Sequence, residues 1–307
     1  MKQWIRGGVL IVMTAAAPAA TSSSQAPLPG CHRVNQALLI SAQEQAKADF
    51  WFSVAEALGD PQGNVFPGIK AAYVDMSNAK ALALQIFQAR ETLCADFGHL
   101  PYSPAVIAAE FSATITNPYA PVRPGRTLVR EKLTPEGLER IETSMGNDVH
   151  MVNGIACRTV REYETLDGVL VEDSRNWIAQ HQNGAVWYFG ELVMSYQDSV
   201  LENLDGSWRY GREGALPGIL ALGLATPGDR YRQEYLLGRA EDVARVVRTG
   251  ETVVVPAGVF HNCLVIEEWD PLEPFEFLLS FIAPHVGLVL EVDLNSGERS
   301  ELVAILN

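Results

Sequence analysis

The stretch NGAVWYFGELV, residues 183–193, predicts a tight turn followed by a β-strand. Asn183-Gly184 is a strong two-residue hairpin signal, because both residue types accept the positive φ that such a turn needs. In a regular strand alternate residues share a face, so Trp187, Phe189 and Glu191 are expected to point the same way. The prediction is an aromatic row that ends in a carboxylate.

Two roles for Glu191 remain open at this point. If the strand emerges into solvent at Gly190, Glu191 is simply exposed. If it does not, Glu191 is a polar anchor in an aromatic pocket, a pattern that small-ligand sites favour. A buried ionised carboxylate needs a cation or hydrogen-bond donors, and the candidate cations are Arg175, Arg209 and Arg232.

The same two-residue period continues on both sides of this hairpin, from about residue 110 to the end of the chain. Turn dipeptides such as Asn153-Gly154, Asp167-Gly168 and Asp205-Gly206 separate β-branched and aromatic runs. This spacing predicts a meander of ten or so antiparallel strands. The chain lacks βα alternation and a glycine-rich phosphate loop, so a nucleotide-binding sheet is excluded.

The preceding part of the chain has a helical period instead. Apolar residues recur at spacings of four and seven, which predicts a pair of amphipathic helices over roughly residues 34–97. The predicted fold class is therefore α+β, with a helical N-terminal segment packed on a mostly antiparallel sheet. The expected segments are a signal peptide (1–19), a flexible leader (20–33), a helical segment (34–109) and an antiparallel β domain (110–307).

The first residues have the pattern of a secretory signal peptide. MKQWIR is positively charged, GGVLIVMTAAAP is apolar, and Ala17-Pro18-Ala19 fits a cleavage site between small residues. We expect an exported, periplasmic or secreted protein, without a transmembrane segment in the mature chain, since no later stretch has about 18 uninterrupted apolar residues. The formal net charge of −14 makes nucleic acid an improbable partner, because an acidic surface repels phosphates.

Four cysteines in an exported chain suggest two disulfides. We predict Cys31–Cys94 within the N-terminal third and Cys157–Cys263 between neighbouring strands of the sheet. An alternative concerns LPGC, residues 28–31, which loosely resembles a bacterial lipobox. In that case Cys31 would carry a lipid anchor and Cys94 would stay unpaired.

Six ordered segments of the β region carry a resemblance to known proteins. They include TNPYAPVRPGRTLV (116–129), VEDSRNWIAQHQNGAVWYFGE (171–191), GSWRYGREGALPGI (206–219) and GDRYRQEYLLGRAEDVARVV (228–247). Together they resemble a family of exported bacterial proteins of no established function, over about residues 111–295. The opening segment also resembles the half-barrel lipoproteins of the LolA and LppX kind. That resemblance implies a curved, mostly antiparallel β-sheet, a half-barrel or open barrel, around a hydrophobic ligand.

A metal site is a second hypothesis. GETVVVPAGVFH, residues 250–261, is similar to the second cupin motif, in which the histidine binds a divalent transition metal. His261 would then need His285, His181 and a carboxylate from separate strands, because the His-x-His of the first cupin motif is missing. The simpler interpretation of His261 is a hydrogen-bonded strand histidine. The chain also lacks a Gly-x-Ser-x-Gly motif, which argues against a serine hydrolase.

A third group of candidate residues is charged. YRQEY places Arg232 and Glu234 on one face of a strand with Gln233 on the other, and Glu241 and Asp242 follow. These residues either line a ligand site or form a structural charge cluster.

The function predicted first is an exported binding protein for a hydrophobic or amphipathic small molecule, without a cofactor. Its expected ligand-binding residues are Trp187, Phe189, Glu191, Arg232 and Glu234. The alternative is a metal-dependent, cupin-like oxygenase or isomerase that uses His261. An extracellular interaction protein with a purely structural aromatic sheet is also compatible with the sequence.

Overall fold

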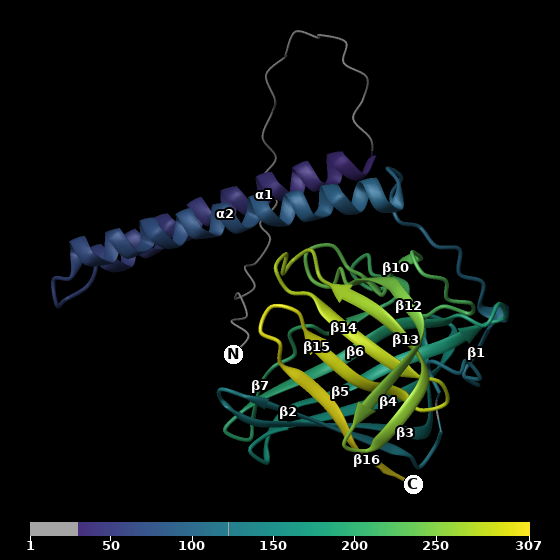
Figure 1. The fold of residues 1–307 in the computed structure, drawn as a ribbon. Coiled ribbons are helices and arrows are strands. Elements are labelled where there is room, and N and C mark those ends of the chain that lie inside the picture. The colour runs from purple at the N-terminus through teal and green to yellow at the C-terminus, as the bar shows by residue number, and fades with distance from the viewer. Residues whose placement is uncertain (1–29, 122) are drawn as a thin grey trace.

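The computed structural model describes residues 30–121 and 123–307. The expected signal peptide and nearly all of the expected leader lie outside these residues. Two helices come first, and a 16-stranded antiparallel sheet follows and curves into a nearly closed barrel (Figure 1). The predicted α+β class and the curved antiparallel sheet are confirmed, although the strands are more numerous than expected.

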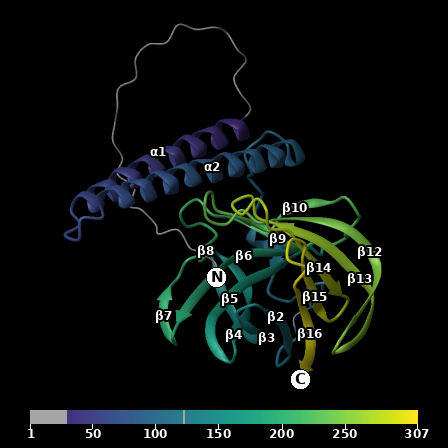
Figure 2. The same ribbon diagram turned by 60° about the vertical axis from the view of Figure 1, so that its left-hand side comes forward.

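The helices form an antiparallel hairpin. Helix α1 spans Gly30–Leu58 and helix α2 spans Val65–Phe97. Asp60 shapes the turn between them, because its carboxylate accepts hydrogen bonds from the backbone N–H groups of Gln62 and Asn64. The hairpin crosses one end of the barrel, and its turn projects beyond the barrel in two views (Figures 1 and 2).

The disulfide Cys31–Cys94 joins the two helices at the end opposite their turn, with a Cα–Cα distance of 5.9 Å. The predicted pairing of these two cysteines is confirmed. The alternative lipid anchor is contradicted, because the Cys31 sulfur is bonded to Cys94 and has no valence left for a lipid. Residues 30–33 belong to α1 rather than to a leader.

The sheet consists mainly of hairpin-connected neighbours. In chain order the strands are β1 (Phe111–Ser112), β2 (Thr127–Thr134), β3 (Gly137–Val152), β4 (Ile155–Leu166), β5 (Val169–His181), β6 (Val186–Gln197), β7 (Val200–Asn203), β8 (Trp208–Arg209), β9 (Leu216–Ala221), β10 (Arg230–Arg232), β11 (Glu234–Tyr235), β12 (Val243–Val255), β13 (Gly258–Trp269), β14 (Leu278–Ala283), β15 (Gly287–Asp293) and β16 (Arg299–Leu306). Their spatial order is β10-β12-β13-β14-β15-β16-β2-β3-β4-β5-β6-β9-β11.

The two edge strands of the sheet, β10 and β11, meet at one residue. Strands β10 and β11 stand at opposite ends of the sheet, yet only Gln233 separates them in the chain. Gly218 in β9 allows the contact, since a Cβ there would lie 2.1 Å from the Gln233 carbonyl oxygen. The barrel therefore closes where the chain passes from β10 to β11.

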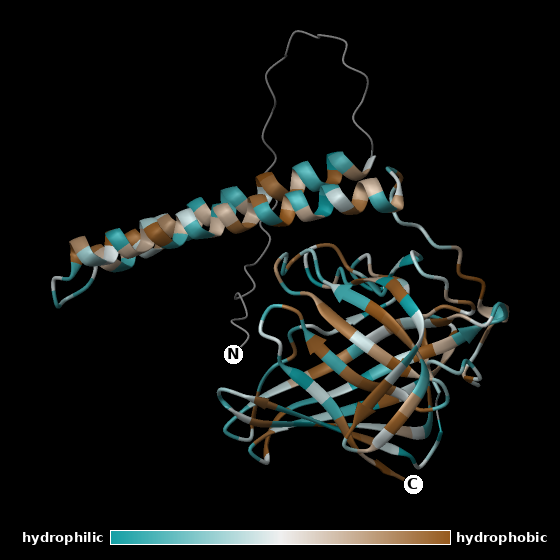
Figure 3. Cartoon of the chain, viewed as in Figure 1, coloured by the Kyte–Doolittle hydropathy of each residue, from teal (hydrophilic) through white to brown (hydrophobic). Residues whose placement is uncertain are grey.

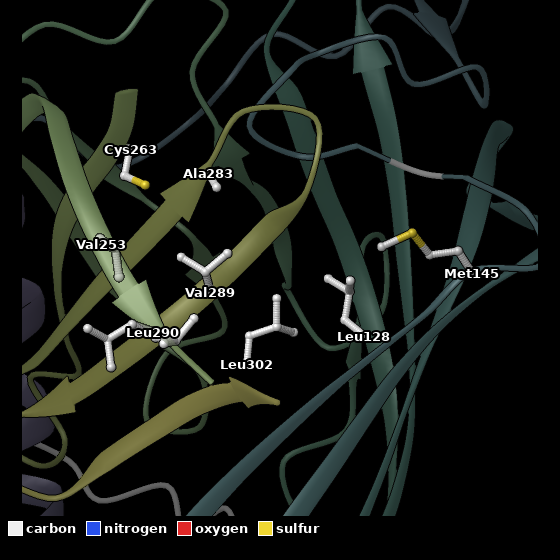
Figure 4. Packing of buried hydrophobic residues seen from close by; sticks show 9 residues of the cluster. Leu128, Met145, Val253, Cys263, Ala283, Val289, Leu290 and Leu302 are labelled. Atoms are coloured by element: carbon white, nitrogen blue, oxygen red, sulfur yellow. The ribbon is translucent and has the colours of Figure 1, made fainter. Parts of the chain in front are cut away.

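The second predicted disulfide is wrong. Cys157 in β4 and Cys263 in β13 are both free and buried, and their strands are not neighbours in the sheet. Cys263 packs in a hydrophobic cluster with Val253 and Ala283 (Figure 4), whereas Cys157 packs in a different cluster with Trp177. Burial raises the pKa of the Cys157 thiol to about 12 and also raises that of Cys263, so both are chemically quiet packing residues.

Candidate functional site

The barrel interior contains a cavity of about 290 Å³. Nine strands and the connection before β2 supply most of its wall, and most of the wall surface is apolar. Tyr119, Ala120 and Pro121 of that connection form one side. The His285 backbone N–H donates to the Pro118 carbonyl at 2.7 Å, which fixes this connection to the turn between β14 and β15.

The cavity wall is arranged in two layers along the strands. Residues two positions apart in a strand share a face, and six strands each place one apolar and one polar inward residue at this spacing. These pairs are Leu128 and Arg130, Met145 and Thr143, Val160 and Glu162, Ile178 and Asn176, Ile266 and Glu268, and Ile282 and Ser280. The polar layer lies toward the β2–β3 and β13–β14 turns, and the apolar layer lies toward Tyr119–Pro121.

Arg130 is the cation of the polar layer. Its side chain is buried, and it donates to the Ser300 hydroxyl at 3.3 Å. The nearest carboxylate oxygens of Glu162 and Glu291 are 4.0 Å away, at the limit of an ion pair. A guanidinium this loosely bound keeps donors available for an anionic or carbonyl group in the cavity.

Glu268 is the main acid of the same layer. The Ser280 hydroxyl donates to one of its oxygens, and the Gln233 amide donates to the other at 2.5 Å. Burial raises the pKa of Glu268 to about 7, against the effect of these hydrogen bonds. Near neutral pH this carboxyl can therefore be either a donor or an acceptor.

Glu191 enters the barrel because β6 contains a β-bulge. Trp177 pairs with Gly190 and Ile178 pairs with Tyr188, so Phe189 is the extra residue. The bulge reverses the alternation, and the Tyr188 hydroxyl lies 3.0 Å from a Glu191 oxygen and also bonds Asn176. The expected common face of Trp187, Phe189 and Glu191 is therefore wrong.

Trp187 and Phe189 point away from the cavity. Phe189 is fully buried in a cluster with Cys157 and Trp177, and the Phe111 ring packs edge-on against both aromatic residues. Neither residue lines the interior cavity. Ligand contact by these two aromatics stays a prediction.

Glu191 belongs to a group of buried carboxyl groups at the helix-facing end of the barrel. Burial raises the pKa of Glu191 to about 8 and that of Asp270 to about 8, and it raises the pKa of Glu234 well above its ordinary value. The charge of Asp242 raises all three further. The sequence suggested that an arginine would pair with Glu191, but no arginine is among its described contacts. Protonation of the Glu191 carboxyl removes the negative charge instead.

Arg232 lies outside the cavity, under the helical hairpin. It lines a second pocket of about 250 Å³, and its guanidinium carbon is 5.2 Å from the ring centres of Phe97 and Tyr235 and 5.7 Å from that of Tyr102. The expected common face with Glu234 is wrong, because β10 ends at Arg232 and β11 starts at Glu234. Gln233 between them turns into the cavity.

The three histidines have separate partners. His261 is exposed and its Nδ1 lies 3.1 Å from the Thr252 hydroxyl, whereas His181 contacts Glu110 at 3.1 Å. His285 is in the turn before β15. Over residues 30–121 and 123–307, no group of three or more His, Cys, Asp or Glu side chains is arranged to hold a metal ion. The metal-dependent alternative stays a prediction.

Sequence reasoning missed most residues of the polar layer, including Arg130, Glu162, Asn176 and Glu268. A usable signal was the spacing Leu128-x-Arg130 and Val160-x-Glu162, because it places a charge on the same face as a core residue. Such a charge is rarely tolerated without a partner.

Comparison with protein-family models finds no match, and no curated protein matches the chain. Among solved structures, the chain is similar to a protein described as a "putative lipoprotein" from Parabacteroides distasonis ATCC 8503. The identity is 14%, the TM-score is 0.35, and the match covers 62% of this chain and 100% of the other. A likeness this distant carries no argument about function. In the described part of the chain, no helix is both long and apolar enough to cross a membrane.

Proposed function

We propose that the protein is an exported binding protein that holds an amphipathic small molecule inside the barrel. The two-layered cavity is the observation that carries this proposal. Ligand sites combine an apolar wall with a few placed polar groups, and this wall has an apolar layer around Leu128 and Ile282 and a polar layer around Arg130 and Glu268.

The two layers suit a ligand with a short apolar body and one polar end. The body would lie toward Tyr119–Pro121, and the polar end would meet Arg130. Arg130 favours a carboxylate or carbonyl at that position, and Glu268 can donate or accept because its pKa is about 7. The Cys31–Cys94 disulfide supports export, since disulfides persist in oxidising compartments.

A cavity-filling variant tests the proposal. Val160→Phe adds a ring to the apolar layer, and we expect it to weaken binding of the fluorescent probe N-phenyl-1-naphthylamine at least tenfold. Leu133→Phe is the matched control, because Leu133 is exposed on the barrel surface. Thermal unfolding of each variant shows whether the fold is kept.

The polar end is tested with a pair of competing ligands. A fatty acid and the alcohol of the same chain length should displace the probe from the wild type with different affinities, the acid being preferred. Arg130→Gln should remove most of that preference. Equal probe binding by the wild type and Val160→Phe, with both proteins folded, would show that the cavity is not the binding site.

A further inference from the structure

We propose that the helical hairpin docks on an anionic lipid surface through the face that it turns away from the barrel. Eight large apolar side chains of the hairpin are between 45% and 86% exposed. Two of them, Phe52 and Val74, lie on a flank, and the other six lie on one side: Ile40, Trp51, Leu58, Phe66, Tyr73 and Leu84. We call these six residues the docking face. Hydrophobic residues alternate with hydrophilic ones along the whole hairpin, including the half that projects beyond the barrel (Figure 3).

The six residues form one straight stripe on each helix. An α-helix has 3.6 residues per turn, so positions about 7 and 11 apart return to the same direction. Ile40, Trp51 and Leu58 are 11 and 7 positions apart in α1. In α2 the spacings of Phe66, Tyr73 and Leu84 are 7 and 11, which mirrors α1 along the antiparallel pair.

Both stripes lie on the same side of the hairpin. Every docking-face residue directly follows a half-buried or buried residue on the side of the partner helix; these are Leu39, Phe50 and Ala57 in α1 and Val65, Ala72 and Ala83 in α2. In two right-handed helices that run antiparallel, the same one-residue step from the contact line leads to the same side. The two stripes therefore make a single apolar surface.

This surface points away from the barrel. Gln85 and Ala89 line a pocket between α2 and the barrel and lie about 100° and 140° round the helix from Leu84, whereas Gln88 of the same pocket lies about 40° from it. Asp96 and Phe97 also contact the barrel, through Arg230 at 3.6 Å and through Arg232. The barrel therefore covers the opposite face of the helices and leaves the docking face open.

The charges of the hairpin follow the same division. Lys47, Lys70 and Lys80 are each four positions from a docking-face residue, and Arg33 is seven positions from Ile40. Three of the five lysines of the chain thus border one face of a protein whose net charge is −14. The acids Glu44 and Glu91 share that side; Glu44 pairs with Lys47 and Glu91 with His32, so among the described residues the positive charge of this border comes mainly from Lys70, Lys80 and Arg33.

The opposite face is acidic. Asp49 and Glu56 lie two and five positions from Trp51, and Asp75 lies two positions from Tyr73, spacings that place all three roughly half a turn away. Apolar and aromatic side chains bordered by lysines, with acids behind, are typical of helices that lie flat on anionic membranes. A second copy of the protein is a less suitable partner for the docking face, because face-to-face packing would place the lysines of the two copies close together and they would repel each other.

Vesicle flotation of the full chain tests this proposal. We expect binding to vesicles of phosphatidylglycerol and phosphatidylcholine to exceed binding to phosphatidylcholine alone, and added salt to weaken it. The double variant Trp51→Ser, Phe66→Ser should lose at least tenfold in partition coefficient. The triple variant Lys47→Gln, Lys70→Gln, Lys80→Gln should lose a similar factor on the anionic vesicles only.

The matched control is Phe52→Ser. Phe52 is 68% exposed, as Trp51 is 67% exposed, but it lies on another side of α1. Its partition should stay within twofold of the wild type. Every variant keeps residues 1–29, so a contribution of that segment cancels. The proposal is overturned if the wild type does not float, if Phe52→Ser loses as much as the double variant, or if sedimentation shows that the stripe variants dissociate a dimer.

Discussion

One extra residue in β6, Phe189, decides which side chains enter the barrel. Without the bulge, Trp187 and Glu191 would share a face. The Glu191 carboxyl group would then lose its hydrogen bond with Tyr188, which lines the cavity. Gly190 makes the bulge possible, because its φ is 136° and Trp208 and Arg209 of β8 pack directly against it. The bulge sends Glu191 inward beside Tyr188.

Gly190→Ala should therefore be strongly destabilising. A Cβ at Gly190 would lie 2.5 Å from the Trp208 carbonyl oxygen, and the positive φ adds backbone strain. We expect a loss of at least about 2 kcal/mol in the free energy of unfolding. Urea unfolding measures it, with Gly297→Ala as control, since Gly297 also has positive φ but open space around it. Equal losses in both variants would mean that the β8 contact has no energetic role.

The buried carboxyl Glu191 makes a prediction about pH. Its folded pKa is about 8, whereas its ordinary value is 4.5, so between these values the folded protein holds a proton that the unfolded chain releases. The free energy of unfolding then falls as pH rises from about 4.5 to 8. Glu234, Asp270 and Glu268 act in the same direction.

Glu191→Gln should make this dependence shallower. The amide keeps the shape of the protonated acid, so the melting temperature of the variant should exceed that of the wild type increasingly from pH 5 to pH 8. Calorimetry at four pH values measures the two slopes. Glu202→Gln, a change of an exposed acid in β7, should leave the slope unchanged. Parallel curves for Glu191→Gln and the wild type would contradict a raised pKa.

At the scale of elements, the hairpin is attached to the barrel by a few polar contacts. Arg90 of α2 donates two hydrogen bonds to Glu241, at 2.8 and 2.5 Å, and both side chains are buried. Glu241 also accepts from the Gly238 backbone N–H at 2.7 Å. The ion pair therefore connects α2 directly to the loop between β11 and β12.

Removing one partner of this pair should release the hairpin. Arg90→Met leaves Glu241 buried without its cation, which typically costs about 3–5 kcal/mol. The double variant Arg90→Met, Glu241→Gln should recover part of the loss. Hydrogen exchange should report faster opening of α2 contacts in the single variant. Arg230→Met, which breaks an exposed pair with Asp96, should cost less than about 1 kcal/mol. A similar cost for both single variants would contradict the structural role of Arg90.

The elements themselves were largely predictable, and their inner faces were not. Turn dipeptides identified the hairpins, as at Asn153-Gly154 and Asp167-Gly168, where the turn residues Asn153 and Asp167 have positive φ. The two helices were predicted from apolar residues that recur at spacings of four and seven. Gly190 was a local signal, because an isolated glycine inside a strand suggests a bulge, but the contact that requires it comes from β8, whose first residue Trp208 lies 19 residues after Phe189.

At the scale of the whole molecule, pairing between strands that are distant in the chain decides how the sheet closes, which the local residue pattern does not determine. Spacing predicted an antiparallel sheet and the family resemblance implied a curved one, but neither predicted that β10 and β11 would meet across Gln233 and close it. The same limit explains the error over Cys157 and Cys263: both lie in strand-like runs, and only the strand order shows that their strands are apart. Cys31 and Cys94 were easier, because both lie in the N-terminal third of the chain, before the sheet begins.

Closure of the barrel leads to a last prediction, at Gly218. Because a Cβ there would lie 2.1 Å from the Gln233 carbonyl oxygen, Gly218→Ala must push β9 away from the β10–β11 junction. Gln233 also donates to Glu268, so the polar layer should be disturbed together with the closure. We expect faster hydrogen exchange in β9–β11 and weaker probe binding, while the β2–β5 hairpins stay protected. Gly59→Ala is the control, because Gly59, like Gly218, has no positive φ, and an added Cβ there would make only ordinary contacts at 3.5 Å. If Gly218→Ala binds the probe like the wild type, the junction is not needed to keep the cavity shaped for a ligand.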